Sequence, residues 1–83
     1  MSTITVYTHA DCHLCEQALD VLQRIRSEHP FELREVDIVA DEALHSAYFE
    51  RVPVVELDGE QVCEYVVDER LVRERLIATR RVP

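Results

Sequence analysis

The sequence predicts an α/β domain in which a mixed four-stranded sheet is flanked by helices. Three observations lead to this fold class. Short β-branched runs alternate with stretches of helical periodicity, and an Asp58-Gly59 pair marks a tight hairpin late in the chain. The 83 residues suffice for one compact domain and leave no room for a second. We therefore expect a single domain over residues 1–83, with the element order βαβαββα.

The first half of the chain is expected to form a strand–helix–strand unit. Residues 3–7 are β-branched and aromatic, which is typical of a strand. Apolar side chains then recur with a helical period over residues 12–28, and Pro30 follows where that helix must end. Residues 31–38 alternate apolar and polar side chains, which indicates a half-buried strand. Because such a crossover is right-handed, these two strands should be parallel.

The second half of the chain is expected to form a short helix and a hairpin. The helix should span about residues 41–50. Its buried stripe should consist of Leu44, Ala47 and Tyr48. Residues 53–57 and 61–66 should pair as antiparallel strands across the Asp58-Gly59 turn.

The last helix has the charge pattern that suits a helix dipole. It should begin near Asp68, a good N-cap, with Glu69 in its first turn, and end on Arg80 and Arg81. This helix should pack on the sheet and complete the fold.

The charge distribution excludes some classes of partner. The net charge is −8, which argues against binding to nucleic acid or to an anionic membrane. Residues 1–69 carry sixteen acidic side chains and four arginines, a net charge of −12, and there is no lysine in the chain. This excess is either a solvated acidic surface or a feature that recruits a basic partner. No apolar stretch approaches the roughly 20 residues of a membrane span.

The cysteine usage indicates a reducing compartment. The N-terminal residues have neither a basic region nor a long apolar run, so we expect no secretory signal and a cytoplasmic protein. The chain has three cysteines, an odd number that argues against a disulfide framework. In the cytosol a closely spaced cysteine pair is more often catalytic or metal-binding than structural.

The main chemical signal is Cys12-His13-Leu14-Cys15, at the junction of the first strand and the first helix. The free N–H groups and positive dipole of a helix N-terminus stabilise a thiolate, which is the attacking species. Cys12 should therefore attack, and Cys15, one turn further on the apolar side, should resolve the mixed disulfide. A protonated His13 would favour the thiolate, whereas Asp11 and Glu16 would oppose it.

Two other interpretations of the cysteines stay open. Both could be small apolar residues without chemistry, as we expect for Cys63 on the fourth strand. A zinc site needs four ligands, and His9 and His13 are the only nearby candidates, so we assign no metal. An iron–sulfur site shared between two chains remains an alternative. On that interpretation the protein would be a non-catalytic adaptor or a carrier of metal or an iron–sulfur cluster.

The cysteine pair, together with Val52-Pro53 at the start of the third strand, resembles a glutaredoxin, and the resemblance covers nearly the whole chain. The segment from Tyr48 to Val54 is similar to that of short glutaredoxin-like domains. The resemblance implies a thioredoxin-like fold and thiol–disulfide oxidoreductase activity on a protein or low-molecular-weight disulfide. It also implies that the Val52–Pro53 bond is cis, lies against the cysteines and offers backbone groups of Val52 to a peptide or to glutathione.

Several residues that glutaredoxins use for glutathione are missing. The lysine that usually precedes the first cysteine is absent. The stretch Glu64-Tyr65-Val66-Val67-Asp68 stands where a Gly-Gly-x-Asp turn is usual, so only the Asp is kept. Arg51 is the one replacement for a carboxylate clamp, and we expect glutathione to be a poor co-substrate. We expect no resident cofactor and a monomer. The candidate site residues are Cys12 and Cys15 for catalysis, and His13, Arg51, Val52 and Pro53 for substrate binding.

Overall fold

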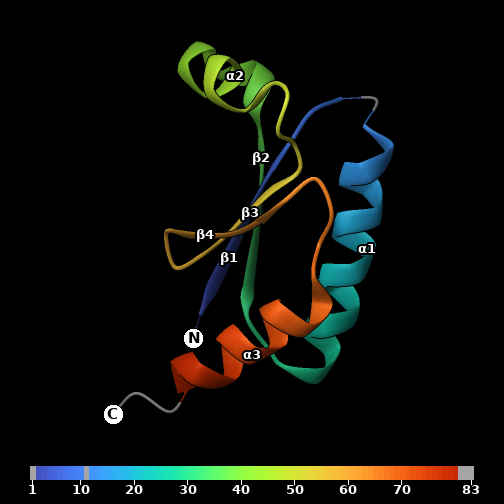
Figure 1. Cartoon of the computed structure of the whole chain (residues 1–83), viewed down its shortest axis with the longest axis vertical. Coiled ribbons are helices and arrows are strands. Elements are labelled where there is room, and N and C mark those ends of the chain that lie inside the picture. Colours follow the sequence, from blue (N-terminus) through green and yellow to red (C-terminus); the bar gives the residue numbers. More distant parts are fainter. Residues whose placement is uncertain (1, 11, 81–83) are drawn as a thin grey trace.

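The computed structural model describes residues 2–10 and 12–80, and it confirms the α/β fold class. Four strands form one mixed sheet in the order β2-β1-β3-β4 (Figure 1). The strands are β1 (Thr3–Thr8), β2 (Glu32–Asp37), β3 (Val54–Leu57) and β4 (Glu60–Glu64). β1 pairs with β2 in parallel and with β3 antiparallel, and β4 pairs antiparallel with β3. The expected βαβαββα order is confirmed, with one short 3-10 helix added.

Three α-helices accompany the sheet. They are α1 (His13–Glu28), α2 (Glu42–Tyr48) and α3 (Glu69–Arg80), and the 3-10 helix η1 (Ile38–Ala40) precedes α2. α2 lies at one end of the sheet, the end where β1 runs into α1, and α3 lies at the other end (Figure 1). None of the described helices is long and apolar enough to cross a membrane.

The core lies between one face of the sheet and the helices α1 and α3. Ile4 and Val6 alternate with half-buried residues along β1, so their side chains point to the same face. On α1 the buried residues follow a helical period. They are Cys15, Ala18, Leu22 and Ile25. Val72 and Leu76 of α3 close the cluster from the far end. This packing fixes the position of α1 relative to the sheet.

Some boundaries differ from the expectation for physical reasons. α1 begins at His13 because Cys12 has extended backbone angles and serves as the N-cap. β4 ends at Glu64 because Tyr65 adopts a positive φ of 67°, which breaks the strand. The expected buried stripe on α2 was wrong, because Ala47 is exposed, Leu44 and Tyr48 are only half-buried, and no residue of this helix is fully buried.

An aspartate side chain caps the N-terminus of each of the helices α2 and α3. The carboxylate of Asp68 accepts a hydrogen bond from the N–H of Leu71 at 3.1 Å, as expected for the N-cap of α3. Asp41 caps α2 in the same way through the N–H groups of Ala43 and Leu44. The expected end of the last helix at Arg81 lies outside the described residues.

Candidate functional site

The two cysteines of the motif lie at the N-terminus of α1 and are joined as a disulfide, with their Cα atoms 5.2 Å apart. Cys12 is the N-cap, and its sulfur accepts a hydrogen bond from the backbone N–H of Cys15 at 3.2 Å. The carbonyl of Cys12 accepts the first helical hydrogen bond, from the N–H of Glu16. The sulfur of Cys12 therefore lies against the positive end of the helix dipole.

Burial separates the two sulfur-bearing residues. Cys12 is half-buried, whereas Cys15 is 3% exposed and belongs to the buried side of α1 with Ala18 and Leu22. A reagent that approaches from solvent meets Cys12 first. This arrangement suits an attacking thiol at position 12 and a shielded resolving thiol at position 15.

The His13 side chain extends into solvent. Its side chain is 93% exposed, and its Nδ1 atom lies 3.7 Å from the carboxylate of Glu16 one helical turn away. An exposed pair of this kind contributes little to stability. Asp11, which we expected to oppose a thiolate, lies outside the described residues.

Arg51 is held by β4. Its Nε donates to the Glu64 carboxylate at 2.7 Å, and its Nη2 donates to the side-chain oxygen of Gln61, also at 2.7 Å. The guanidinium lies 5.3 Å from the ring centre of Tyr48. The hydrogen bond that Arg51 donates to the Glu64 carboxylate raises the pKa of Arg51. Its charge is thus already paired with a carboxylate, which competes with any bound anion.

Val52 and Pro53 connect α2 to β3, and the peptide bond between them is cis. The N–H of Val52 donates to the Tyr48 carbonyl at 3.1 Å, so this donor is used within the chain. The Pro53 carbonyl accepts from the N–H of Tyr65 at 2.9 Å. These two hydrogen bonds link the start of β3 to α2 on one side and to the residue after β4 on the other.

Two hollows lie beside the first turns of α1. One, of about 70 Å³, lies between α1 and the segment that leads from β4 to α3. It is lined by Leu14, Gln17, Ala18, Val21, Tyr65, Val66 and Val67. The other, of about 230 Å³, includes both cysteines and faces the end of β2. It is lined by Thr8, His9, Ala10, Cys12, Cys15, Glu16, Leu19, Glu35 and Asp37.

Sequence reasoning did not assign a role to several of these lining residues. Leu14 lies within the cysteine motif without a predicted role, and the sequence predicts no site role for Tyr65 or Glu35. Leu14 alone carries little signal in the sequence, because single exposed leucines are common on protein surfaces. Tyr65 and Glu35 reach the site only through the fold, from segments 50 and 20 residues further along the chain than Cys15.

Cys63, the third cysteine, lies apart from the pair at the start of α1. Cys63 lies on β4, packs against the core cluster and is free. Burial raises the pKa of the Cys63 thiol above its ordinary value of 9.0, so this sulfur is a weak nucleophile. Over residues 2–10 and 12–80, no group of three or more His, Cys, Asp or Glu side chains is placed to hold a metal ion.

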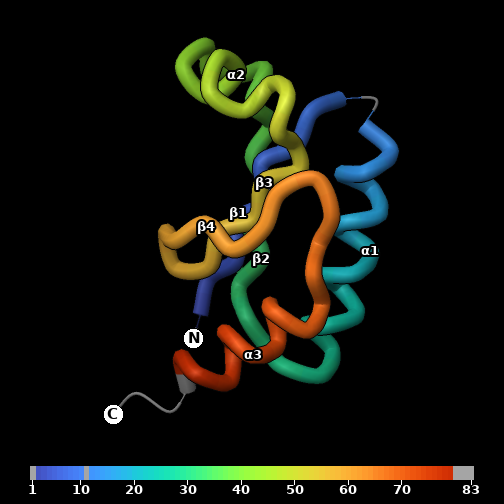
Figure 2. The backbone as a smooth tube through the Cα atoms, in the orientation of Figure 1, coloured from blue at the N-terminus to red at the C-terminus, as the bar shows by residue number. Residues whose placement is uncertain are grey.

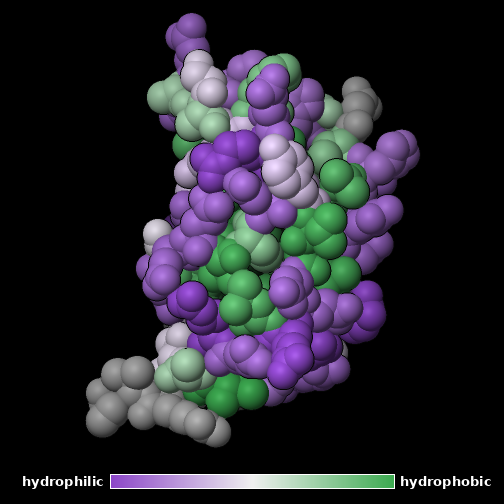
Figure 3. Space-filling model, in the orientation of Figure 1, coloured by the Kyte–Doolittle hydropathy of each residue, from purple (hydrophilic) through white to green (hydrophobic). Residues whose placement is uncertain are grey.

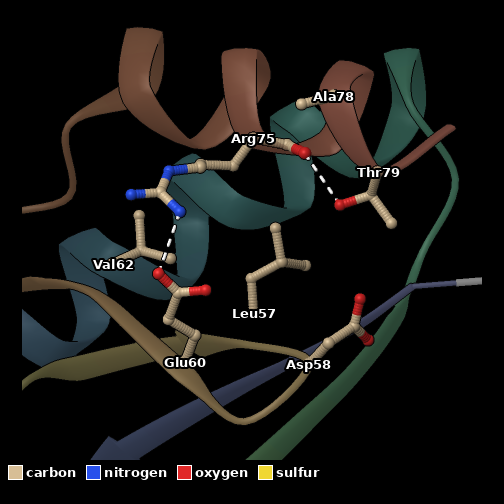
Figure 4. Close-up of a pocket in the computed structure, with 7 residues that line it drawn as sticks. All are labelled: Leu57, Asp58, Glu60, Val62, Arg75, Ala78 and Thr79. Carbon is tan, nitrogen blue, oxygen red and sulfur yellow. Dashed lines mark hydrogen bonds and ion pairs between the residues drawn. The ribbon is translucent and has the colours of Figure 1, made fainter. Parts of the chain in front are cut away.

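A further cavity, of about 250 Å³, lies between α3 and the β3–β4 hairpin (Figure 4). Arg75 reaches from α3 to the carboxylate of Glu60 at 3.1 Å across it, and Thr79 donates to the Arg75 carbonyl on the same helix. Neither cysteine of the pair lines this cavity. The cysteine pair and the two hollows beside it therefore lie at the other end of the sheet, around the N-terminus of α1.

Comparison with known proteins agrees with this geometry. Residues 3–77 match the family described as Glutaredoxin-like domain (DUF836). Protein XcR50 from X. campestris has a crystal structure with a TM-score of 0.73 and 37% identity, covering 90% of this chain and 96% of that one. Protein Ne2328 from Nitrosomonas europaea gives a TM-score of 0.80 at 29% identity, with 89% of each chain covered.

A thioredoxin is also similar in structure. A mutant thioredoxin from Halobacterium salinarum gives a TM-score of 0.67 at 27% identity and covers 93% of this chain and 73% of that one. The strand order, the cysteine pair at the start of α1 and the match over residues 3–77 point to the same conclusion. This chain belongs to the glutaredoxin-like (DUF836) family and has a thioredoxin-like fold.

Proposed function

We propose that this protein is a thiol–disulfide oxidoreductase in which Cys12 attacks and Cys15 resolves. The observation that carries the proposal is the hydrogen bond from the Cys15 N–H to the Cys12 sulfur at the start of α1. A sulfur in that position is stabilised as a thiolate by the donor and by the helix dipole. The burial of Cys15 supports its role as the second, internal nucleophile.

The reaction balances as two exchanges. In the reduced protein the Cys12 thiolate attacks one sulfur of a substrate disulfide, forms a mixed disulfide and releases the other sulfur as a thiolate. The Cys15 thiol then loses its proton to solvent and attacks the Cys12 sulfur. This step forms the Cys12–Cys15 disulfide and releases the reduced substrate. Two electrons pass from the protein to the substrate, and an external thiol reductant restores the dithiol.

The setting that we propose is the cytoplasm, with the protein acting as a monomer. A reduced thiol pool there regenerates the dithiol, and a net charge of −8 disfavours nucleic acid and anionic membranes as partners. Glutathione is proposed only as a poor co-substrate. It carries two carboxylates, and Arg51, the one candidate clamp beside Val52-Pro53, is already paired with Glu64.

The experiment is single-turnover reduction of a small neutral disulfide, such as hydroxyethyl disulfide, by the reduced protein. Wild type and the Cys63→Ser control should form the Cys12–Cys15 disulfide at equal rates. Cys12→Ser should lose the reaction, and Cys15→Ser should stop at a mixed disulfide on Cys12 that mass spectrometry identifies. Equal reaction of wild type and Cys12→Ser would overturn the proposal. Bound iron or zinc after purification, without a reversible dithiol–disulfide couple, would favour the metal-carrier alternative.

A further inference from the structure

The first turns of α1 separate two hollows of opposite chemical character. On one side Leu14, Ala18 and Val21 face the segment after β4, and we call this hollow the apolar groove. On the other side Cys12 and Cys15 open toward the carboxylates at the end of β2, and we call this hollow the acidic pocket. A substrate bound at the Cys12 sulfur would lie at the boundary between them.

The apolar groove exposes large hydrophobic side chains of α1 and of the segment after β4. Leu14 is 41% exposed, Tyr65 is 45% exposed and Val66 is 68% exposed. The segment that follows β4 runs alongside α1 in Figure 2, and Figure 3 shows hydrophobic side chains gathered over that region with hydrophilic ones around them. Exposed apolar side chains that gather in one place, rather than singly, mark a candidate interaction site.

The backbone of the groove offers little to a polar ligand. The N–H of Tyr65 donates to the Pro53 carbonyl at 2.9 Å, and the N–H of Val66 donates to the Glu64 carbonyl at 2.8 Å. Both donors are therefore used within the chain. An anionic ligand that needs backbone N–H groups finds apolar side chains there instead, so the groove favours an apolar side chain.

The acidic pocket has the charge to accept a cation. Three of its lining side chains are the carboxylates of Glu16, Glu35 and Asp37, His9 also lines it, and among the described residues no arginine does. The Thr8 hydroxyl donates to the Glu35 carboxylate at 3.4 Å, and Asp37 caps η1 through the N–H of Val39. Neither contact neutralises the negative charge. A lysine or arginine side chain of a substrate would be attracted to this pocket. The net charge of −12 over residues 1–69 adds to this attraction.

We propose that the substrate is a polypeptide disulfide whose cysteine has an apolar side chain on one side and a basic side chain on the other. This inference rests on the proposed function. In an extended segment, side chains two positions before and after a cysteine point the same way as the cysteine, each roughly 7 Å along the chain. One of them would enter the apolar groove while the other enters the acidic pocket. The Cys12 thiolate bonds to the peptide sulfur, and the partner thiol leaves as a thiolate.

The test uses short peptides of the form X-Ala-Cys-Ala-Z with blocked termini. Each cysteine is joined to the same acidic aromatic thiol, whose release is followed by absorbance. In two of the peptides one of X and Z is leucine and the other is lysine, in either order. The comparison peptides carry leucine and glutamate, serine and lysine, or serine and glutamate at these two positions. The reduced protein should react with the better leucine/lysine order about tenfold faster than with the serine/glutamate peptide. Added salt should remove the lysine preference and leave the leucine preference.

Matched variants locate each preference. The leucine preference is the rate with the leucine/lysine peptide divided by the rate with the serine/lysine peptide. Val66→Ser and Leu14→Gln should each reduce this ratio to less than about half of its wild-type value, whereas Val39→Ser should keep it, because Val39 is also exposed but lies outside the groove. Glu35→Gln should reduce the lysine preference, whereas Glu32→Gln on the same strand should keep it. Two groove variants are used so that one misfolded variant does not decide the result.

The outcomes separate this inference from the proposed function. Equal rates on all peptides, or a preference for glutamate or for the same mixed disulfide of glutathione, would overturn the inference if hydroxyethyl disulfide is still reduced. Preferences that the Val66, Leu14 and Glu35 variants leave unchanged would also overturn it. No reaction of wild type with any disulfide, the small neutral one included, would overturn the proposed function and this inference with it.

Discussion

The backbone N–H of Cys15 donates a hydrogen bond to the sulfur of Cys12 at 3.2 Å, so the shielded cysteine of the pair supplies a donor to the accessible one. In the reduced protein we expect this donor to stabilise the charged form of Cys12. The same helical turn places the Cys15 side chain in the core. We therefore expect the two thiols to differ in both acidity and access.

The first prediction concerns alkylation of the reduced protein. Iodoacetamide at pH 7 should modify Cys12 at least about tenfold faster than Cys15, because Cys12 has the larger thiolate fraction and the more accessible sulfur. Peptide mass mapping at short reaction times measures both rates. Equal rates, or a faster Cys15, would reverse the assignment of attacking and resolving thiols.

The second prediction concerns glutathione and the Arg51–Glu64 pair. Turnover with glutathione should be low in wild type, and Arg51→Ala should lower it further. Glu64→Gln should raise it about twofold, because the weakened pair leaves the Arg51 guanidinium available to a carboxylate of the ligand. Glu56→Gln, on the neighbouring strand, serves as the control for a general loss of negative charge. High turnover with glutathione that none of the three substitutions changes would show that Arg51 does not bind a carboxylate of the ligand.

The third prediction concerns Cys63 and alkaline pH. Burial raises the pKa of this thiol above 9.0, so less than about 1% of it is thiolate at pH 7 and it should alkylate slowly in the disulfide form of the protein. A raised pKa in the folded state favours folding below pH 9.0, and this contribution is lost as the pH rises through the folded-state pKa.

Stability measurements test the same prediction. The free energy of unfolding of wild type should fall between pH 8 and pH 10.5, and Cys63→Ala should show a smaller fall. Denaturant unfolding of the two proteins at each pH gives the comparison. The tyrosines titrate in both proteins, so the difference isolates Cys63. Parallel pH profiles would contradict the prediction.

The fourth prediction concerns the core that supports the site. Leu22 is fully buried between α1 and the sheet, and Leu22→Ala should lower the free energy of unfolding by about 2–5 kcal/mol. For a domain of this size that is a large share of the total. The neighbouring Gln23 is exposed, so Gln23→Ala should change stability by no more than about 0.5 kcal/mol. Similar losses in both variants would mean that this part of α1 is not packed as described.

Much of the fold was predictable because its signals are local. The β-branched run of β1, the helical period of α1 and the Asp68 cap each act within a few residues, and each predicted element is present. The Asp58-Gly59 hairpin is also local: both residues have positive φ, 51° and 87°, which this pair of residue types tolerates. The position of the cysteine pair at a helix N-terminus followed directly from these elements.

The surroundings of the cysteines were decided only by the tertiary structure. Strand pairing places Gln61 and Glu64 of β4 against Arg51, so the predicted anion clamp is an internal ion pair. The positive φ of Tyr65 turns the chain after β4 back alongside Leu14 and forms the apolar groove. These contacts join residues that are 10 to 51 positions apart. The sequence by itself determined the helices and strands and the position of the cysteine pair, because both depend on neighbouring residues. The register of distant segments determined what surrounds that pair.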